Sequence, residues 1–233
     1  MGTDLLVFGP HPDDLEIGLG ASIARHAALG MRVGLCDLTQ GEMGTNGTVE
    51  ERLNEAERAR VVLGAAWREN LRWPDRHIGK DPGHLDHAVE FIRLHQPRTI
   101  AIPYWQDRHP DHVAASAVLT EAAFNAGLRR YRPSASLAAW RPEWLCYYFI
   151  NDDVEPSFVI DASEHYEKKR QALDCHSSQF QRTAPGAADT RLNTPVFRQM
   201  IESRDARFGA KAGVRWAEGV VVRETQLRTT LLK

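Results

Sequence analysis

The sequence has little cysteine, no long apolar run and no large excess of one charge. Its three cysteines, Cys36, Cys146 and Cys175, are scattered and form no C-x-x-C pair, so we expect no disulfide framework and a reducing compartment. No window reaches the roughly 20 apolar residues of a membrane span, and residues 1–20 lack the features of a secretion signal. The formal net charge of -2 gives no broad attraction to nucleic acid. We therefore predict a cytoplasmic protein with neither a membrane nor a nucleic-acid partner.

The composition is that of an ordinary globular protein. The chain has 233 residues, of which 42% are hydrophobic and 26% are charged. This length fits one α/β domain with a modest extension. We predict a single domain over residues 1–233, with a core at about 1–130 and a C-terminal elaboration at about 131–233.

The first half of the chain alternates short apolar runs with helical segments. Apolar runs are at 5–8, 31–38, 67–71 and 99–102, and helical patterns are at 15–29, 48–63, 85–95 and 110–125. This alternation predicts an α/β fold, with a mostly parallel sheet and helices on both faces. After Gly127 the pattern changes. Strands at 144–150, 157–160 and 218–223 and helices at 163–175 and 194–209 predict a further α/β elaboration.

Two of the apolar runs are followed by similar polar segments. The sequence HPDD at 11–14 follows the first run, and HPDH at 109–112 follows the fourth. In open α/β sheets, ligands and chemistry gather at the carboxyl ends of the strands. Histidine and carboxylate without cysteine suit zinc or a similar metal. The two segments therefore predict one divalent-metal site built from distant parts of the chain.

The spacing within each segment allows side chains to converge. His11 and Asp14 are three residues apart, and so are His109 and His112. A catalytic zinc needs three protein ligands and an open position for water, which two histidines and one carboxylate provide. The spacing leaves open which histidine of the second segment is the ligand. Asp13, beside the ligands, is the candidate general base.

The remaining histidine of the second segment would lie near a substrate carbonyl. Protonated, it could stabilise an oxyanion and later protonate a leaving amine, and Asp111 is the nearest acid that could raise its pKa and orient it. The structural alternative is that each segment is only a turn and a helix cap. The presence of both segments at equivalent strand ends favours the metal site.

These motifs carry a resemblance to a known family. PHPDD at 10–14 with Glu16 and Gly18, followed by HPDH at 109–112, resembles the LmbE-like (PIG-L) family of metal-dependent N-deacetylases. Other segments resemble its bacillithiol-biosynthesis branch, whose members deacetylate N-acetylglucosaminyl-malate. They are TQGE at 39–42, GT at 44–45 and 47–48, Arg52, PDR at 74–76, PYWQDR at 103–108, KK at 168–169, SQF at 178–180, Arg204 and FG at 208–209.

The resemblance implies a Rossmann-like α/β fold and a defined site. The family's residues fall on His11, Asp14 and His112 as metal ligands, Asp13 as general base, and His109 beside the carbonyl with Asp111 as its partner. The implied cofactor is Zn²⁺, with Fe²⁺ as an alternative that suits the same ligands. The branch is often hexameric, so a homo-oligomer is also implied. In relatives a tyrosine approaches the oxyanion, and Phe197 falls near that place here.

Two arginines are candidate substrate contacts. Arg52 and Arg108 lie on loops beside the two segments, and an arginine fork matches a carboxylate such as those of malate. The alternative is that they pair with local acids such as Glu42 or Asp107.

The leading hypothesis is a zinc-dependent hydrolase that removes the N-acetyl group from a small amino-sugar conjugate, N-acetylglucosaminyl-malate above others. One alternative keeps the chemistry but changes the substrate to another N-acyl glucosamine conjugate, such as a thiol conjugate or an antibiotic. A second alternative is a non-catalytic sugar-binding module on the same fold.

Overall fold

The computed structural model describes residues 2–133, 136–181, 187–225, 227 and 230. Its centre is a seven-stranded sheet with the strand order β3-β2-β1-β4-β5-β7-β6. The strands are β1 (Leu5–Gly9), β2 (Val33–Thr39), β3 (Trp67–Trp73), β4 (Thr99–Pro103), β5 (Trp144–Tyr148), β6 (Phe158–Asp161) and β7 (Ala217–Val221). Neighbours among β1 to β5 pair in parallel, which confirms the predicted mostly parallel sheet.

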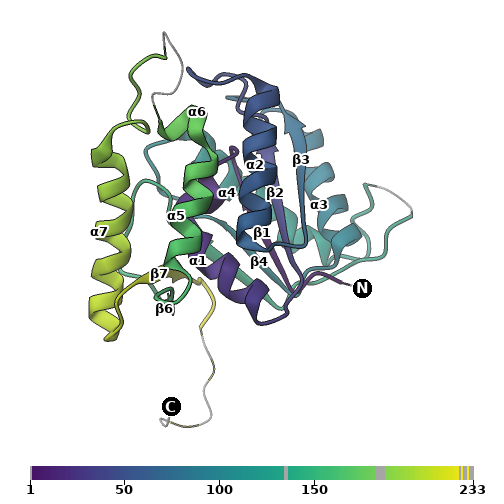
Figure 1. The fold of residues 1–233 in the computed structure, drawn as a ribbon. Coiled ribbons are helices and arrows are strands. Elements are labelled where there is room, and N and C mark those ends of the chain that lie inside the picture. Colours follow the sequence, from purple (N-terminus) through teal and green to yellow (C-terminus); the bar gives the residue numbers. More distant parts are fainter. Residues whose placement is uncertain (1, 134–135, 182–186, 226, 228–229, 231–233) are drawn as a thin grey trace.

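Helices cover both faces of this sheet, as predicted (Figure 1). They are α1 (Asp14–Ala28), α2 (Val49–Leu63), α3 (Gly83–His95), α4 (Pro110–Ala126), α5 (Tyr166–Cys175), α6 (Ser177–Phe180) and α7 (Pro195–Ala212). Helices α1, α2 and α5 contact one another on one face, and α3 packs against α4 on the other. The short helix α6 has no counterpart in the predicted elements.

Burial on both faces explains why the central strands are continuous apolar runs. Every residue of β1 and β2 is buried. Side chains alternate along a strand, so Leu6 and Phe8 enter the core under α3 and α4, whereas Leu5 and Val7 enter the core under α1 and α2. A strand covered by helices on both sides has no polar face to show in its sequence.

The last three strands close the sheet differently. Strand β7 lies between β5 and β6 and is antiparallel to both. Strands β5 and β6 follow each other in sequence, but β7 separates them in the sheet. The C-terminal elaboration thus extends the same sheet, and α7 packs against β7 and β6.

The strand order reverses direction at β1. From β1 the chain winds outward to β2 and β3 on one side, and then to β4 and β5 on the other. The carboxyl ends of β1 and β4 are adjacent at this reversal, where ligands bind in open α/β sheets.

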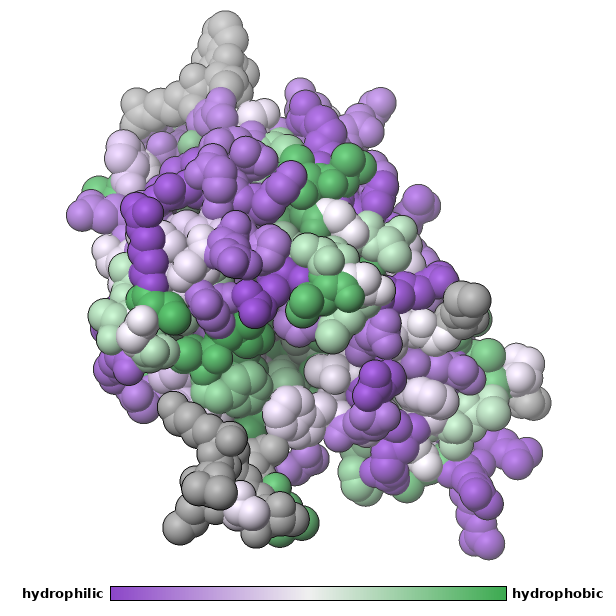
Figure 2. Space-filling view, turned by 60° about the horizontal axis from the view of Figure 1, so that its bottom comes forward, coloured by the Kyte–Doolittle hydropathy of each residue, from purple (hydrophilic) through white to green (hydrophobic). Residues whose placement is uncertain are grey.

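Among the described residues, no helix is both long enough and apolar enough to span a bilayer. On the face shown in Figure 2, patches of hydrophobic residues are interrupted by hydrophilic ones.

Candidate active site

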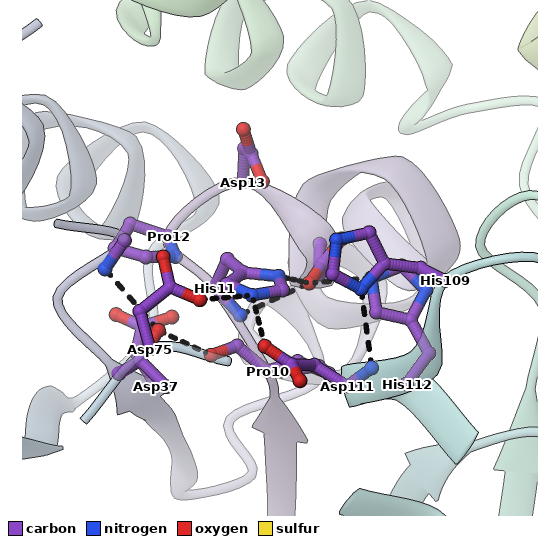
Figure 3. A network of polar contacts seen from close by, with 12 residues as sticks. Pro10, His11, Pro12, Asp13, Asp37, Asp75, His109, Asp111 and His112 are labelled. Carbon is purple, nitrogen blue, oxygen red and sulfur yellow. Dashed lines mark hydrogen bonds and ion pairs between the residues drawn. The ribbon is translucent and has the colours of Figure 1, made fainter. Parts of the chain in front are cut away.

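The two predicted segments meet at the reversal of the strand order (Figure 3). His11 follows β1, and His109 and His112 follow β4. The ring centroids of His11 lie 4.9 Å from His109 and 5.6 Å from His112, and His109 stacks on His112 at 4.6 Å. Residues about a hundred positions apart in sequence therefore form a single cluster.

A strained turn sets the direction of the first segment. Asp13 has φ of 124°, in the left-handed region that residues other than glycine avoid. Such a backbone conformation costs about 1–3 kcal/mol of folding free energy. The buried guanidinium of Arg52 supports this turn, since it donates to the carbonyl of Pro12 at 2.8 Å and to that of Gly41 at 2.9 Å. The turn directs the Asp13 side chain away from the other labelled carboxylates (Figure 3).

The second segment begins a helix. His109 is the N-cap of α4, and its Nδ1 accepts the backbone N–H of Asp111 at 3.2 Å. Its own N–H donates to Asp107 Oδ1 at 2.7 Å. His112 lies in the first turn of the helix, with its ring centroid 5.6 Å from that of His11.

The carboxylate of Asp14 lies between the two predicted ligand histidines. Asp14 Oδ2 lies 3.1 Å from His11 Nδ1 and 3.3 Å from His112 Nε2. Bonds of about 2.0–2.1 Å in a tetrahedral zinc site place neighbouring ligand atoms about 3.3 Å apart. The residues are 9%, 4% and 3% exposed for His11, Asp14 and His112. Asp14 Oδ2 is therefore within this spacing of both histidines, and all three side chains are largely shielded from bulk water.

Carboxylates also contact the outer nitrogen of these two histidines. His11 Nε2 lies 3.2 Å from Asp75 Oδ1 and 3.4 Å from Asp111 Oδ2. His112 Nδ1 lies 3.0 Å from Asp107 Oδ1. Such partners fix the tautomer and the orientation of a ligating imidazole.

Two groups of donors that could hold a metal ion occur among the described residues, and neither includes Asp14. His11, His109 and His112 can each offer a nitrogen within 4.8 Å of the others, and His11 can be grouped in the same way with Asp75 and Asp111. The structure thus contains a histidine and aspartate site that could hold a metal, and each grouping includes His11.

The three imidazoles differ in their pKa values. Burial lowers the pKa of His109 to about 4, with the neighbouring His112 and His11 acting in the same direction. Burial also works against protonation of His112, but Asp14 and Asp107 outweigh it and raise the pKa of His112 to about 9. The pKa of His11 is likewise raised against burial, by hydrogen bonds to its carboxylate neighbours.

The adjacent aspartates of the first segment also differ. Burial raises the pKa of Asp13 to about 6, although Arg52 opposes the shift. Burial would raise the pKa of Asp14 too, but the charges of His112 and His11 hold it well below its usual range.

The hydrogen bonds of the Asp111 side chain go to groups other than the His109 ring. Its carboxylate accepts the Arg76 backbone N–H at 2.9 Å and the Arg76 guanidinium at 3.0 Å, and it approaches His11 instead. His109 receives only the main-chain N–H of Asp111, because an N-cap side chain bonds the amide two residues on. The charge of Asp111 acts to raise the pKa of His109, as predicted, but burial and the two neighbouring histidines outweigh it.

The two candidate substrate arginines have different surroundings. Arg52 lies on α2, so its predicted place on a loop is wrong. It is only 4% exposed, and two of its nitrogens bond main-chain carbonyls, so it supports the turn. It also lies 3.4 Å from Asp13 rather than beside Glu42. Arg108 is exposed, and its backbone N–H donates to Asp152.

A cavity of about 500 Å³ opens over the cluster. Asp13, His109 and Arg108 line it, together with Arg191 and Phe197 from the C-terminal half. The guanidinium of Arg191 lies 5.2 Å above the Phe197 ring. This volume is within the range of small-molecule sites.

Sequence reasoning missed four residues of this site. Asp75 and Asp107 lie on loops after β3 and β4, so the rule that chemistry gathers at strand ends could have identified them. Asn151 donates to Asp107 at 3.0 Å and accepts from Arg191 at 3.0 Å. No local motif distinguishes Asn151 or Arg191 in the sequence.

Comparison with known proteins agrees with this geometry. The family described as PIG-L, GlcNAc-PI de-N-acetylase, matches residues 6–123. A diacetylchitobiose deacetylase of Thermococcus kodakarensis is 29% identical, over 93% of this chain and 81% of its own length. A 1D-myo-inositol 2-acetamido-2-deoxy-alpha-D-glucopyranoside deacetylase of a Nocardioides species is 28% identical, over 78% of this chain and 84% of its own. The crystal structure of the conserved protein TT1542 from Thermus thermophilus has a TM-score of 0.88 and 34% identity, over 99% of both chains.

Proposed function

Because the chain belongs to the GlcNAc-PI de-N-acetylase (PIG-L) family, we propose that it is a metal-dependent hydrolase that removes the N-acetyl group from a glucosamine conjugate. The two relatives described above are named as deacetylases of N-acetylated sugars. The observation that carries the proposal is the convergence of the two strand-end segments on one set of donors, beside a carboxylate that faces a cavity.

His11, Asp14 and His112 would hold the metal, for which Zn²⁺ is our first choice and Fe²⁺ the alternative. When bound, such a cation supplies Lewis acidity, which acidifies water and polarises an amide carbonyl. The support for this ligand set is its spacing around Asp14 Oδ2 and the carboxylate partners of both histidines.

Asp13 would act as the general base. Its carboxylate lines the cavity, so it can accept a proton from the water that attacks the amide carbon. The oxygen of that water forms the new bond to carbon, and the bond from carbon to nitrogen then breaks. The proton passes to the leaving nitrogen, so the products are acetate and a free amine.

His109 would contact the carbonyl oxygen and the leaving group. Its Nδ1 accepts a main-chain N–H, so a neutral ring carries its proton on Nε2. The ring lines the cavity, and an Nε2–H donor there can stabilise negative charge on the oxygen. Phe197 has no hydroxyl to share this task, and Phe197 lines the same cavity.

We further propose an anionic substituent on the sugar, and N-acetylglucosaminyl-malate of bacillithiol biosynthesis as the substrate. Arg108 and Arg191 both line the cavity, and the charge of Arg108 is among the causes, after burial, that lower the pKa of Arg191. Two neighbouring cations favour a ligand with carboxylates. Arg52, whose guanidinium supports the turn at Asp13, also lines the cavity and remains a candidate substrate contact.

The test is a panel of N-acetylglucosamine conjugates assayed for free amine and acetate. The purified protein is stripped with a chelator and reloaded with Zn²⁺ or Fe²⁺, and the aglycones are malate, inositol and a second N-acetylglucosamine. We expect metal-dependent hydrolysis, fastest with malate. Equal rates for charged and neutral aglycones would contradict the anionic substrate. Metal loading with no hydrolysis of any conjugate would favour a sugar-binding module instead.

A further inference from the structure

Helix α1 is interrupted a short distance after Asp14. Leu19 has φ of -133° and ψ of 19°, which is not helical, although hydrogen bonding continues on both sides. Glycines flank this residue. A Cβ on Gly18 would lie 2.2 Å from the Tyr148 ring, so the first part of α1 approaches β5 more closely than any other residue would permit. The break separates the turn that carries Asp14 from the rest of the helix.

A break in a helix leaves carbonyls and amides without their usual partners. Two side chains from the C-terminal half satisfy them here. Arg204 of α7 donates from Nη2 to the carbonyl of Ile17 at 2.7 Å. Glu218 of β7 accepts the N–H of Ala21 at 3.1 Å and that of Ser22 at 2.6 Å. Both ends of the break are therefore held by charged groups that are distant in sequence.

These two side chains belong to a buried network of balanced charge. Arg204 Nε donates to Asp205 Oδ1 at 3.0 Å, and Lys169 Nζ lies 2.7 Å from both Asp205 and Glu218. Lys169, Asp205 and Glu218 are each 0% exposed. Two cations thus face two anions in the protein interior, where an unpaired charge is very costly.

Arg204 also reaches the other side of the site. Its Nη1 donates to the carbonyl of Ile150 at 3.0 Å, just after β5. The next residue, Asn151, donates to Asp107 at 3.0 Å, and Asp107 contacts His112. One rigid guanidinium therefore connects the first turn of α1 to the segment that supports His112.

We propose that Arg204 is a positioning residue that holds Asp14 at ligand distance from His112. This inference rests on the proposed function, in which those two residues bind the same cation. The planar guanidinium has separate nitrogens for the Ile17 and Ile150 carbonyls, and a lysine ammonium at that place would keep the charge without spanning both groups.

The decisive variant is Arg204→Lys. We expect its affinity for Zn²⁺ to fall about 10- to 100-fold, as with other partners that orient metal ligands. We expect kcat to fall by a similar factor with little change in KM, because Arg204 is not among the described residues that line the cavity. In the metal-free protein, hydrogen exchange of the peptide that contains Ile17 to Ser22 should become faster.

Glu218→Gln is the matched control. It disturbs the same buried network and the cap on Ala21 and Ser22, but it leaves the bridge from Ile17 to Ile150 in place. We expect a lower Tm and an affinity for Zn²⁺ within about twofold of the wild type. Arg198→Lys is a second control on the same helix, where Arg198 forms an outer ion pair with Asp174.

If Arg204→Lys does not fold, the double variant Arg204→Gln with Asp205→Asn replaces it in the same measurements. This variant removes one charge of each sign, so the net charge of the buried network does not change. A folded Arg204 variant with wild-type affinity for Zn²⁺ would overturn the proposal, and so would an equal loss of affinity in Glu218→Gln. If the wild type itself binds no Zn²⁺, the proposed ligand set fails, whereas the exchange experiment still decides whether Arg204 joins α1 to β5.

Discussion

The two strand-end segments share a sequence pattern but have different surroundings. In both, the third residue is an aspartate. Asp13 lies in a strained turn with φ of 124° and faces the cavity, whereas Asp111 lies within α4 and its carboxylate is bound by Arg76. The comparison teaches that the same short motif can place one carboxylate at a cavity and the other in bonds to neighbouring side chains, and we propose that only the first is reactive.

The histidines differ in the same way. His11 and His112 have carboxylate oxygens within 3.4 Å of both ring nitrogens. Within the described part of the chain, His109 forms no such ion pair, and its Nδ1 contact is a main-chain amide. An imidazole between carboxylates suits a bound cation, whereas an imidazole with one nitrogen fixed by a main-chain amide suits contact with the uncharged N-acetyl group of a substrate. We therefore base the proposed roles of ligand and catalyst on the neighbours of each histidine and not on the spacing.

The strongest test of this comparison replaces the two third-position aspartates in turn. Asp13→Asn should lower kcat by about 10²- to 10⁴-fold, because a general base is lost, while the bound metal is retained. Asp111→Asn should cost less, because Arg76 and His11 can still contact the amide oxygen. Steady-state kinetics and elemental analysis of both variants measure these effects. Equal losses of kcat would show that the two positions are not functionally distinct.

A second test replaces the two histidines of the second segment, one at a time. His112→Ala should lose metal, with at least about a 100-fold weaker affinity, since a direct ligand matters more than the groups that orient it. His109→Ala should retain metal and lose about 10²- to 10³-fold in kcat, as expected for a group that stabilises the oxyanion. Metal titration followed by turnover of the loaded protein separates the two cases. Metal loss on replacing His109, with His112→Ala unaffected, would reverse the assignment.

Much of this site was predictable because its signals are local. Short apolar runs identify buried parallel strands, and polar segments directly after them identify the edge of the sheet where ligands gather. The positions of His11, Asp14 and His112 at that edge follow from these two rules. The pattern could not show that a main-chain amide, and not the Asp111 carboxylate, contacts His109, because that choice depends on helix capping geometry.

The supporting residues were not predictable for a different reason. Asn151, Arg191 and Arg204 come from the C-terminal half, and their partners are main-chain carbonyls or side chains far away in sequence. Arg52 was expected to contact substrate, yet in the fold its nearest acceptors are the carbonyls of a turn. A single arginine in a sequence carries no signal that separates a buried support from a surface contact, since only the fold brings its acceptors near.

The smallest expected effect concerns the carboxylates that orient the two proposed metal-binding histidines. The histidines differ in how many carboxylates face the ring nitrogen that points away from Asp14. His112 Nδ1 faces one carboxylate, that of Asp107, whereas His11 Nε2 faces both Asp75 and Asp111. Asp107→Asn should therefore weaken Zn²⁺ binding about tenfold, within the range for orienting partners. Asp75→Asn should weaken it less, because Asp111 still holds the ring. Competition with a calibrated chelator measures both affinities. A larger loss from Asp75→Asn would mean that Asp111 does not orient His11 and that its bond to Arg76 dominates.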